Sequence, residues 1–147
     1  MADEKVDPLA PTVAKKFAER RPTYTGVMLD EASHHALVAW WKEHTDAPLL
    51  EKVIAHHMTV KFKPTAEELE KTPKGEKVKL KVIGWAADEK GQAVLVAPDG
   101  IASAQKHPHV TVAVAPGVPA FYSNELLEKG VNRVSGPTLT GVVDAGF

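Results

Sequence analysis

Two copies of one short pattern constrain this chain more than any other feature. The segments 57–60 (HMTV) and 109–112 (HVTV) both read His-x-Thr-x, and each lies in an apolar, β-branched run typical of a strand. Strand side chains alternate between two faces, so the histidine and the threonine of each copy share a face. If the two strands lie side by side, we expect one groove to be lined by His57, Thr59, His109 and Thr111.

This set of side chains suits phosphodiester hydrolysis without a metal ion. An imidazole with an ordinary pKa near about 6.5 can take up or release a proton at neutral pH. One histidine is then expected to act as the general base and the other as the general acid. The threonine hydroxyls are expected to donate hydrogen bonds to phosphate oxygens. Which histidine is the base is left open by the sequence, and no cofactor is expected.

Length and composition favour one soluble domain over residues 1–147, with 1–8 as a polar, flexible tail. The chain is 44% hydrophobic and 25% charged, as in globular proteins. No apolar stretch reaches the roughly 18 residues that span a bilayer, so we expect no membrane contact. A polar N-terminal segment and the lack of cysteine favour a cytoplasmic location. The formal net charge of −1 disfavours binding to long nucleic acid, and we expect a monomer or weak homo-oligomer.

The apolar pattern predicts an α+β fold. Helices are expected over 11–21, from Asp30 or Ser33 to about His44, after Thr65, and over 123–129. Strands are expected over 24–29, 53–62, 77–87, 92–97, 110–115 and 139–143. The third and fourth of these strands form a hairpin around the turn at 88–91. The expected strands and helices do not alternate regularly, as they do in parallel β-α-β units. This order predicts mainly antiparallel sheets with helices on the outer faces.

Paired His-x-Thr strands in a small, cysteine-free α+β chain resemble the two-histidine (2H) phosphoesterase superfamily. A further similarity rests on the segment 24–27 (YTGV), the doubled histidine at 56–57 and the compact length. It links the chain to the branch of RNA-repair-like small proteins and of the phage anti-CBASS nucleases that destroy cyclic oligonucleotide signals. The resemblance implies a two-lobed fold in which each lobe contributes one such strand to a central cleft.

The resemblance implies a phosphodiesterase that hydrolyses cyclic or terminal phosphodiesters of nucleotides or RNA ends, with the four motif residues as its catalytic groups. Tyr24 is a candidate for stacking on the substrate or contacting its phosphate. Trp85 falls either on the apolar face of its strand or at the strand end near the cleft. Phe147 either closes over a ligand, as terminal segments do in the phage nucleases, or follows a strand that completes a sheet.

Three alternatives stay open at this point. The first is a phage-type nuclease that degrades cyclic di- or trinucleotide immune signals. The second is a non-catalytic module that binds a nucleotide or an RNA end, although a pure binder needs no histidine at both motif positions. The third is a metal hydrolase in which His107 and His109 form a His-x-His pair with His57 as a third ligand. Otherwise His56 and His107 are expected to face away from the cleft or to lie at its edge.

Overall fold

The computed structural model describes residues 22–146. The expected tail over 1–8, the expected helix over 11–21 and Phe147 lie outside the described residues. The helices of the described part are α2 (Glu31–His44), α3 (Ala66–Lys71) and α4 (Tyr122–Lys129). Its strands are β1 (Tyr24–Leu29), β2 (Lys52–Val53), β3 (His57–Phe62), β4 (Lys77–Ala87), β5 (Gly91–Asp99), β6 (His109–Val114), β7 (Asn132–Arg133) and β8 (Thr138–Gly146).

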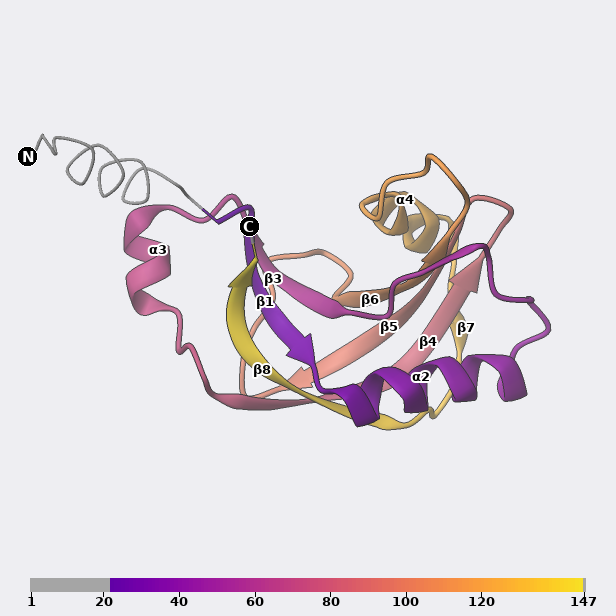
Figure 1. Ribbon diagram of the computed structural model, residues 1–147, viewed down its shortest axis with the longest axis horizontal. Helices are drawn as coiled ribbons and strands as arrows, with labels where there is room; N and C mark the ends of the chain where they lie inside the picture. Colours follow the sequence, from indigo (N-terminus) through magenta and orange to yellow (C-terminus); the bar gives the residue numbers. More distant parts are fainter. Residues whose placement is uncertain (1–21, 147) are drawn as a thin grey trace, which may run out of the picture.

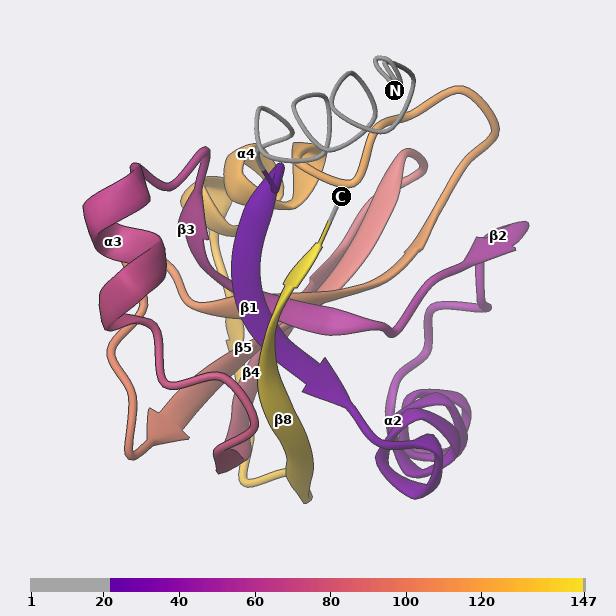
Figure 2. The same ribbon diagram turned by 60° about the vertical axis from the view of Figure 1, so that its left-hand side comes forward.

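The strands form one antiparallel sheet that closes on itself. In the order β6-β3-β1-β8-β4-β5 each strand pairs with the next, and β5 pairs back with β6. Figure 1 shows α2 and α4 on opposite sides of this barrel, and Figure 2 shows α3 outside it, beside β3. The predicted antiparallel α+β fold is confirmed. The two-lobed arrangement is not confirmed, because both His-x-Thr strands belong to one barrel.

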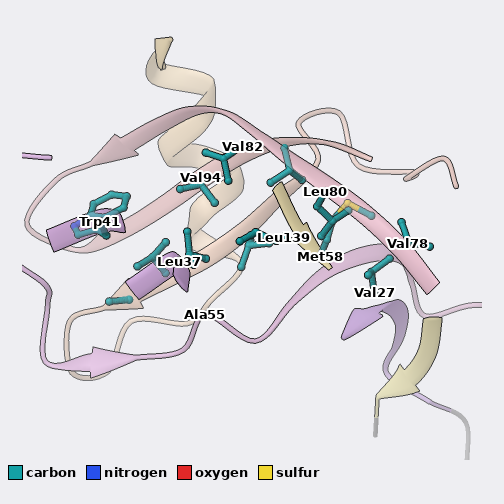
Figure 3. Close-up of a cluster of buried hydrophobic side chains, with 14 of the residues drawn as sticks. Val27, Leu37, Trp41, Ala55, Met58, Val78, Leu80, Val82, Val94 and Leu139 are labelled. Carbon is teal, nitrogen blue, oxygen red and sulfur yellow. The ribbon is translucent and has the colours of Figure 1, made fainter. Parts of the chain in front are cut away.

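The interior of the barrel holds the main hydrophobic core. The strands contribute fully buried residues such as Met58 of β3, Leu80 of β4 and Val110 of β6. Leu37 and Trp41 of α2 join the same cluster (Figure 3). Because neighbouring residues of a strand point to opposite faces, the residues next to these core positions lie on the outer face of the barrel. The four motif residues are such neighbours, so the barrel presents them on its outer surface.

Several local predictions are confirmed by the helix ends and the hairpin. The side chain of Asp30 caps α2 by accepting a hydrogen bond from the backbone N–H of Ser33, at 2.7 Å. Thr65 and Glu68 form a reciprocal capping box at the start of α3. Strands β4 and β5 form the expected hairpin. None of the helices within residues 22–146 is long and apolar enough to cross a membrane.

The strand predicted over 53–62 is interrupted, and β2 and β3 are its two pieces. The interruption lies at Ala55, which is fully buried and has a φ of 45°. This left-handed conformation breaks an extended strand. The backbone N–H of Ala55 still donates to the carbonyl of Thr111 at 2.9 Å, so the chain stays attached to β6 through the break. Strand β3 therefore begins at His57, the first residue of the first motif.

A β-bulge in β3 changes which face its last residue occupies. Gly26 of β1 opposes Thr59, and Tyr24 opposes Phe62. In β1 one residue lies between Tyr24 and Gly26, whereas in β3 two residues lie between Thr59 and Phe62. Strict alternation would put Phe62 on the face opposite to Thr59, and the extra residue returns it to the same face. Gly26 allows this close approach, because a Cβ at that position would lie 2.6 Å from the carbonyl oxygen of Met58.

We expect Gly26→Ala to destabilise the protein by about 2 kcal/mol or more, because the added methyl group meets backbone rather than a mobile side chain. Urea denaturation followed by circular dichroism measures the change. The comparison variant is Gly91→Ala, whose Cβ would meet the ring of Tyr122 at 2.9 Å, a side chain rather than backbone. An unfolding free energy of Gly26→Ala equal to that of the parent would contradict the role of Gly26 in the bulge.

Candidate active site

All four motif residues line one cavity of about 590 Å³. The cavity is lined by Tyr24, Ile54, His57, Thr59, Phe62, Gln105, His109, Thr111, Ala120, Phe121 and Asn124. None of these lining residues carries a carboxylate or an ammonium group. The polar groups that face the cavity are therefore imidazoles, hydroxyls and amides.

The pairing of β3 with β6 sets the arrangement of the motif residues. These strands are antiparallel, with Met58 opposite Val110. In that register His57 lies across from Thr111, and Thr59 lies across from His109. Each imidazole is therefore a neighbour of the hydroxyl of the other motif, and the two motifs are related by an approximate twofold axis.

Elements on two sides of these strands bound the cavity. On one side Leu126 of α4 packs with Leu95 on the outer face of β5, and the turn before α4 contributes Phe121. On the other side Tyr24 and Phe62 face each other across β1 and β3. The outer face of β3 and β6 thus forms the floor of the cavity, with aromatic residues on both sides.

His57 is held by an aromatic partner and by a second histidine. Its ring stacks on Tyr24, with ring centroids 4.3 Å apart and planes inclined by 16°. The Nδ1 atom of His57 lies 3.0 Å from Nδ1 of His56 and 3.5 Å from the hydroxyl oxygen of Tyr24. Burial raises the pKa of the Tyr24 hydroxyl, so this group stays protonated. Because these contacts occupy Nδ1, Nε2 is the nitrogen of His57 that can serve a substrate.

The pKa of His57 is lowered to about 4, first by burial and then by the nearby charges of His56 and His109. His57 is therefore neutral at neutral pH. A folded-state pKa below the unfolded value of about 6.5 means that protonation favours the unfolded chain. Through this group the protein loses stability as the pH falls from about 6.5 to 4, by on the order of 3 kcal/mol.

His109 is oriented by the backbone. Its Nδ1 atom lies 2.7 Å from the carbonyl oxygen of His107. A carbonyl oxygen only accepts, so Nδ1 of His109 carries a hydrogen and Nε2 is left free to exchange a proton. Burial lowers the pKa of His109, the hydrogen bond to the His107 carbonyl opposes part of that shift, and the charge of the His107 side chain adds to it. The charged form is therefore more accessible to His109 than to His57.

The two threonine hydroxyls differ in their surroundings. The Thr111 hydroxyl lies 2.8 Å from the hydroxyl of Ser123, and it donates to the carbonyl of Ala120 at 3.3 Å. Ser123 is almost fully buried at the start of α4. The Thr59 hydroxyl has no hydrogen-bond partner among residues 22–146. Thr59 can therefore donate directly to a ligand, whereas Thr111 must first turn its hydrogen away from the protein.

The other predicted substrate contacts have different outcomes. Tyr24 lies in the cavity beside His57. Trp85 does not line it, and its ring instead packs edge-on against Trp41, with centroids 5.4 Å apart. Trp85 therefore takes the apolar alternative stated for it. Phe147 lies outside the described residues, so its proposed contact stays a prediction.

The histidines that flank the motifs lie close to the site. His56 takes the second alternative stated for it, at the edge of the cavity: it does not line the cavity, but its Nδ1 atom lies 3.0 Å from Nδ1 of His57. The Nε2 atom of His107 lies 2.8 Å from a carboxylate oxygen of Glu128. The described part of the chain contains no cluster of three His, Asp or Glu side chains that could hold one metal ion. The three-histidine ligand set is therefore not assembled there.

Sequence reasoning missed the residues that complete the cavity and orient its groups. They are Ile54, Phe62, Gln105, Ala120, Phe121, Ser123 and Asn124. Phe62 could not be placed on the cavity face from the sequence, because the bulge breaks the simple alternation of the strand. The residues before and within α4 reach the site through a turn whose path no periodic pattern encodes. The one usable signal was Phe121, a large apolar residue outside any predicted element.

We expect the imidazole of His57 to titrate near pH 4, well below the ordinary value, in an NMR titration of the histidine ring protons. Replacing His56 by Gln removes one of the charges that lower the pKa of His57, so the midpoint should move upward. His35→Gln is the matched control, since His35 is an exposed residue paired with Glu31 on α2. A midpoint near 6.5 in the parent protein would contradict the buried, crowded environment of His57.

Residues 31–144 match the family described as the fungal tRNA ligase phosphodiesterase domain, and both motifs lie within this range. No curated protein sequence matches the chain. A crystal structure of a fungal RNA kinase has a similar fold, with a TM-score of 0.59 at 13% sequence identity.

The match with the fungal RNA kinase covers 84% of this chain and 46% of the other. This protein thus corresponds to about half of that larger chain, and at such low identity the likeness concerns the fold alone. The family match spans most of this chain and includes all four motif residues. The chain belongs to the family of fungal tRNA ligase phosphodiesterase domains, which are of the two-histidine phosphoesterase type.

Proposed function

We propose that the protein hydrolyses 2′,3′-cyclic phosphates at RNA 3′ ends by acid–base catalysis between His57 and His109, without a metal ion. The observation that carries this proposal is the cavity in which both imidazoles and both motif hydroxyls meet. The family match supports it, because the family is described as a phosphodiesterase domain of tRNA ligases. The absence of carboxylates among the lining residues suits a phosphate anion.

The surroundings of the two histidines favour His57 as the base and His109 as the acid. When the pair holds one proton, that proton resides on His109, because the His107 carbonyl stabilises the protonated ring through Nδ1. His57 has the lower pKa and stays neutral. Its Nε2 atom then carries the free lone pair that a general base needs.

The reaction that follows is a balanced hydrolysis. Nε2 of His57 takes a proton from a water molecule as the water oxygen forms a bond to phosphorus. The bond between phosphorus and one ribose oxygen breaks, and Nε2 of His109 gives its proton to that oxygen. The product is a phosphate monoester beside a free ribose hydroxyl. A proton then moves from His57 to solvent, and His109 regains one.

The threonines stabilise the charge that builds on the phosphate. Thr59 donates to one non-bridging oxygen, since its hydroxyl has no competing partner among the described residues. Thr111 donates to the other, and Ser123 can donate to Thr111 in turn, across the 2.8 Å contact between their hydroxyls. A chain of donors of this kind polarises the last hydroxyl and strengthens its hydrogen bond. The stacked ring of Tyr24 keeps the base in place.

A substrate with a good leaving group tests the assignment of base and acid. On an oligonucleotide with a 2′,3′-cyclic phosphate, we expect His57→Ala and His109→Ala each to lower kcat by about 10²- to 10⁴-fold. A nitrophenyl phosphodiester of a nucleoside releases nitrophenolate, which needs no proton. With this substrate His109→Ala should lose far less activity, whereas the loss for His57→Ala should persist. Assays run in EDTA with the same variants.

The two results that contradict the proposal are distinct. If His57→Ala, rather than His109→Ala, kept its activity on the nitrophenyl substrate, then His57 would be the acid and His109 the base. Absence of turnover by the parent on the cyclic phosphate would overturn the activity itself. In that case, turnover of cyclic di- or trinucleotides would favour the nuclease alternative, and binding without turnover would favour a non-catalytic module. His35→Gln serves as the control for general effects of removing a histidine.

The pH dependence of kcat/KM should be bell-shaped, with its maximum on the acidic side of neutrality. Activity should rise as the pH increases through about 4, because His57 must lose its proton to act as base. It should fall as the pH passes the pKa of His109, which lies below about 6.5, because His109 must hold its proton to act as acid. Initial rates at low substrate concentration measure the profile. A maximum at pH 8 or above would contradict this protonation scheme.

A further inference from the structure

Two phenylalanine side chains are exposed at the cavity that holds the motif residues. Phe62 is 54% exposed and Phe121 is 73% exposed, and both line the cavity. The other exposed large hydrophobic residues of the described chain are Val53 and Val142, and neither lines it. Exposed apolar surface that gathers at one concave site indicates a surface for a ligand.

The two rings come from opposite sides of the cavity. The bulge in β3 turns Phe62 toward the motif residues, and Phe121 precedes α4 on the other side. Within residues 22–146 neither ring stacks on another aromatic ring. Their position is thus not explained by packing within the protein.

The chemistry of the rings fits nucleobases. Proteins recognise single-stranded RNA ends by stacking the bases on aromatic side chains, and such stacking tolerates different bases. A cation lies over one of the rings, since Nζ of Lys63 is 5.5 Å from the centroid of Phe62. An ammonium group next to a stacking ring suits the phosphate that joins two nucleotides. A cyclic phosphate on a sugar without a base would use neither feature.

Building on the function proposed above, we propose that Phe62 and Phe121 stack on nucleobases of a single-stranded RNA 3′ end and thereby set the substrate specificity. The cyclic phosphate enters between His57 and His109 while the bases rest on the two rings. The substrate class is then a base-bearing RNA end, and a sugar cyclic phosphate without a base is a poor substrate.

The experiment compares two dinucleotides that both end in a 2′,3′-cyclic phosphate. One carries both bases, and in the other the bases are replaced by hydrogen. The proteins are the parent, Phe62→Ala, Phe121→Ala, the corresponding leucine variants, and Val142→Ala as an exposed apolar control on the outer surface of β8. Steady-state kinetics give KM and kcat for each pair, and thermal unfolding verifies that each variant is folded.

On the base-bearing dinucleotide each alanine variant should raise KM by about 10- to 100-fold and leave kcat nearly unchanged. The leucine variants should also lose affinity, because leucine is apolar but has no aromatic face. On the abasic dinucleotide the parent should already have a high KM, and the variants should match it. Val142→Ala should behave as the parent on both substrates.

Two results would overturn this inference while leaving the proposed function intact. One is turnover by the parent with equal KM for the two dinucleotides. The other is a loss of affinity in the phenylalanine variants that is equally large on the abasic substrate. Failure of the parent to turn over either dinucleotide would count against the proposed function as well, so the two failures are distinguishable.

Discussion

The site depends on the direct pairing of β3 with β6. These strands are far apart in sequence, and their pairing completes one side of the barrel. The same pairing buries Met58 and Val110 in the core and places the residues beside them on the outer face. A shift of the register by one residue would move the histidines into the core and the core residues into water. The core therefore fixes the arrangement of the catalytic candidates.

The features with a local physical cause could be predicted from the sequence. The period-two pattern of β4, the Asp30 cap and the capping box of Thr65 each depend on neighbouring residues, and each is confirmed. The same alternation correctly placed the histidine and threonine of each motif on one face of a strand. The closure of the sheet was not predictable, because the pairing of β5 with β6 joins segments that share no local signal.

The parts that sequence reasoning missed come from departures from regular structure. The left-handed residue Ala55 lies between β2 and β3, and just after it the Nδ1 atoms of His56 and His57 lie 3.0 Å apart. The bulge opposite Gly26 turns Phe62 toward the cavity. Both depend on a close approach of backbones from different strands, which a single-strand pattern does not contain. The candidate catalytic groups were thus found from the sequence, whereas most groups that surround them were not.

The hydrogen bond from His109 to the carbonyl of His107 has a consequence for how this site tolerates mutation. The acceptor is a backbone atom, so substituting the side chain at position 107 leaves it in place. The tautomer of His109 is therefore set by the backbone conformation at 107–109, which the ring of Pro108 restricts. A substitution of the His107 side chain can remove its hydrogen bond to Glu128 without disturbing the imidazole of His109. Loss of this orientation would instead require a change that moves the main chain.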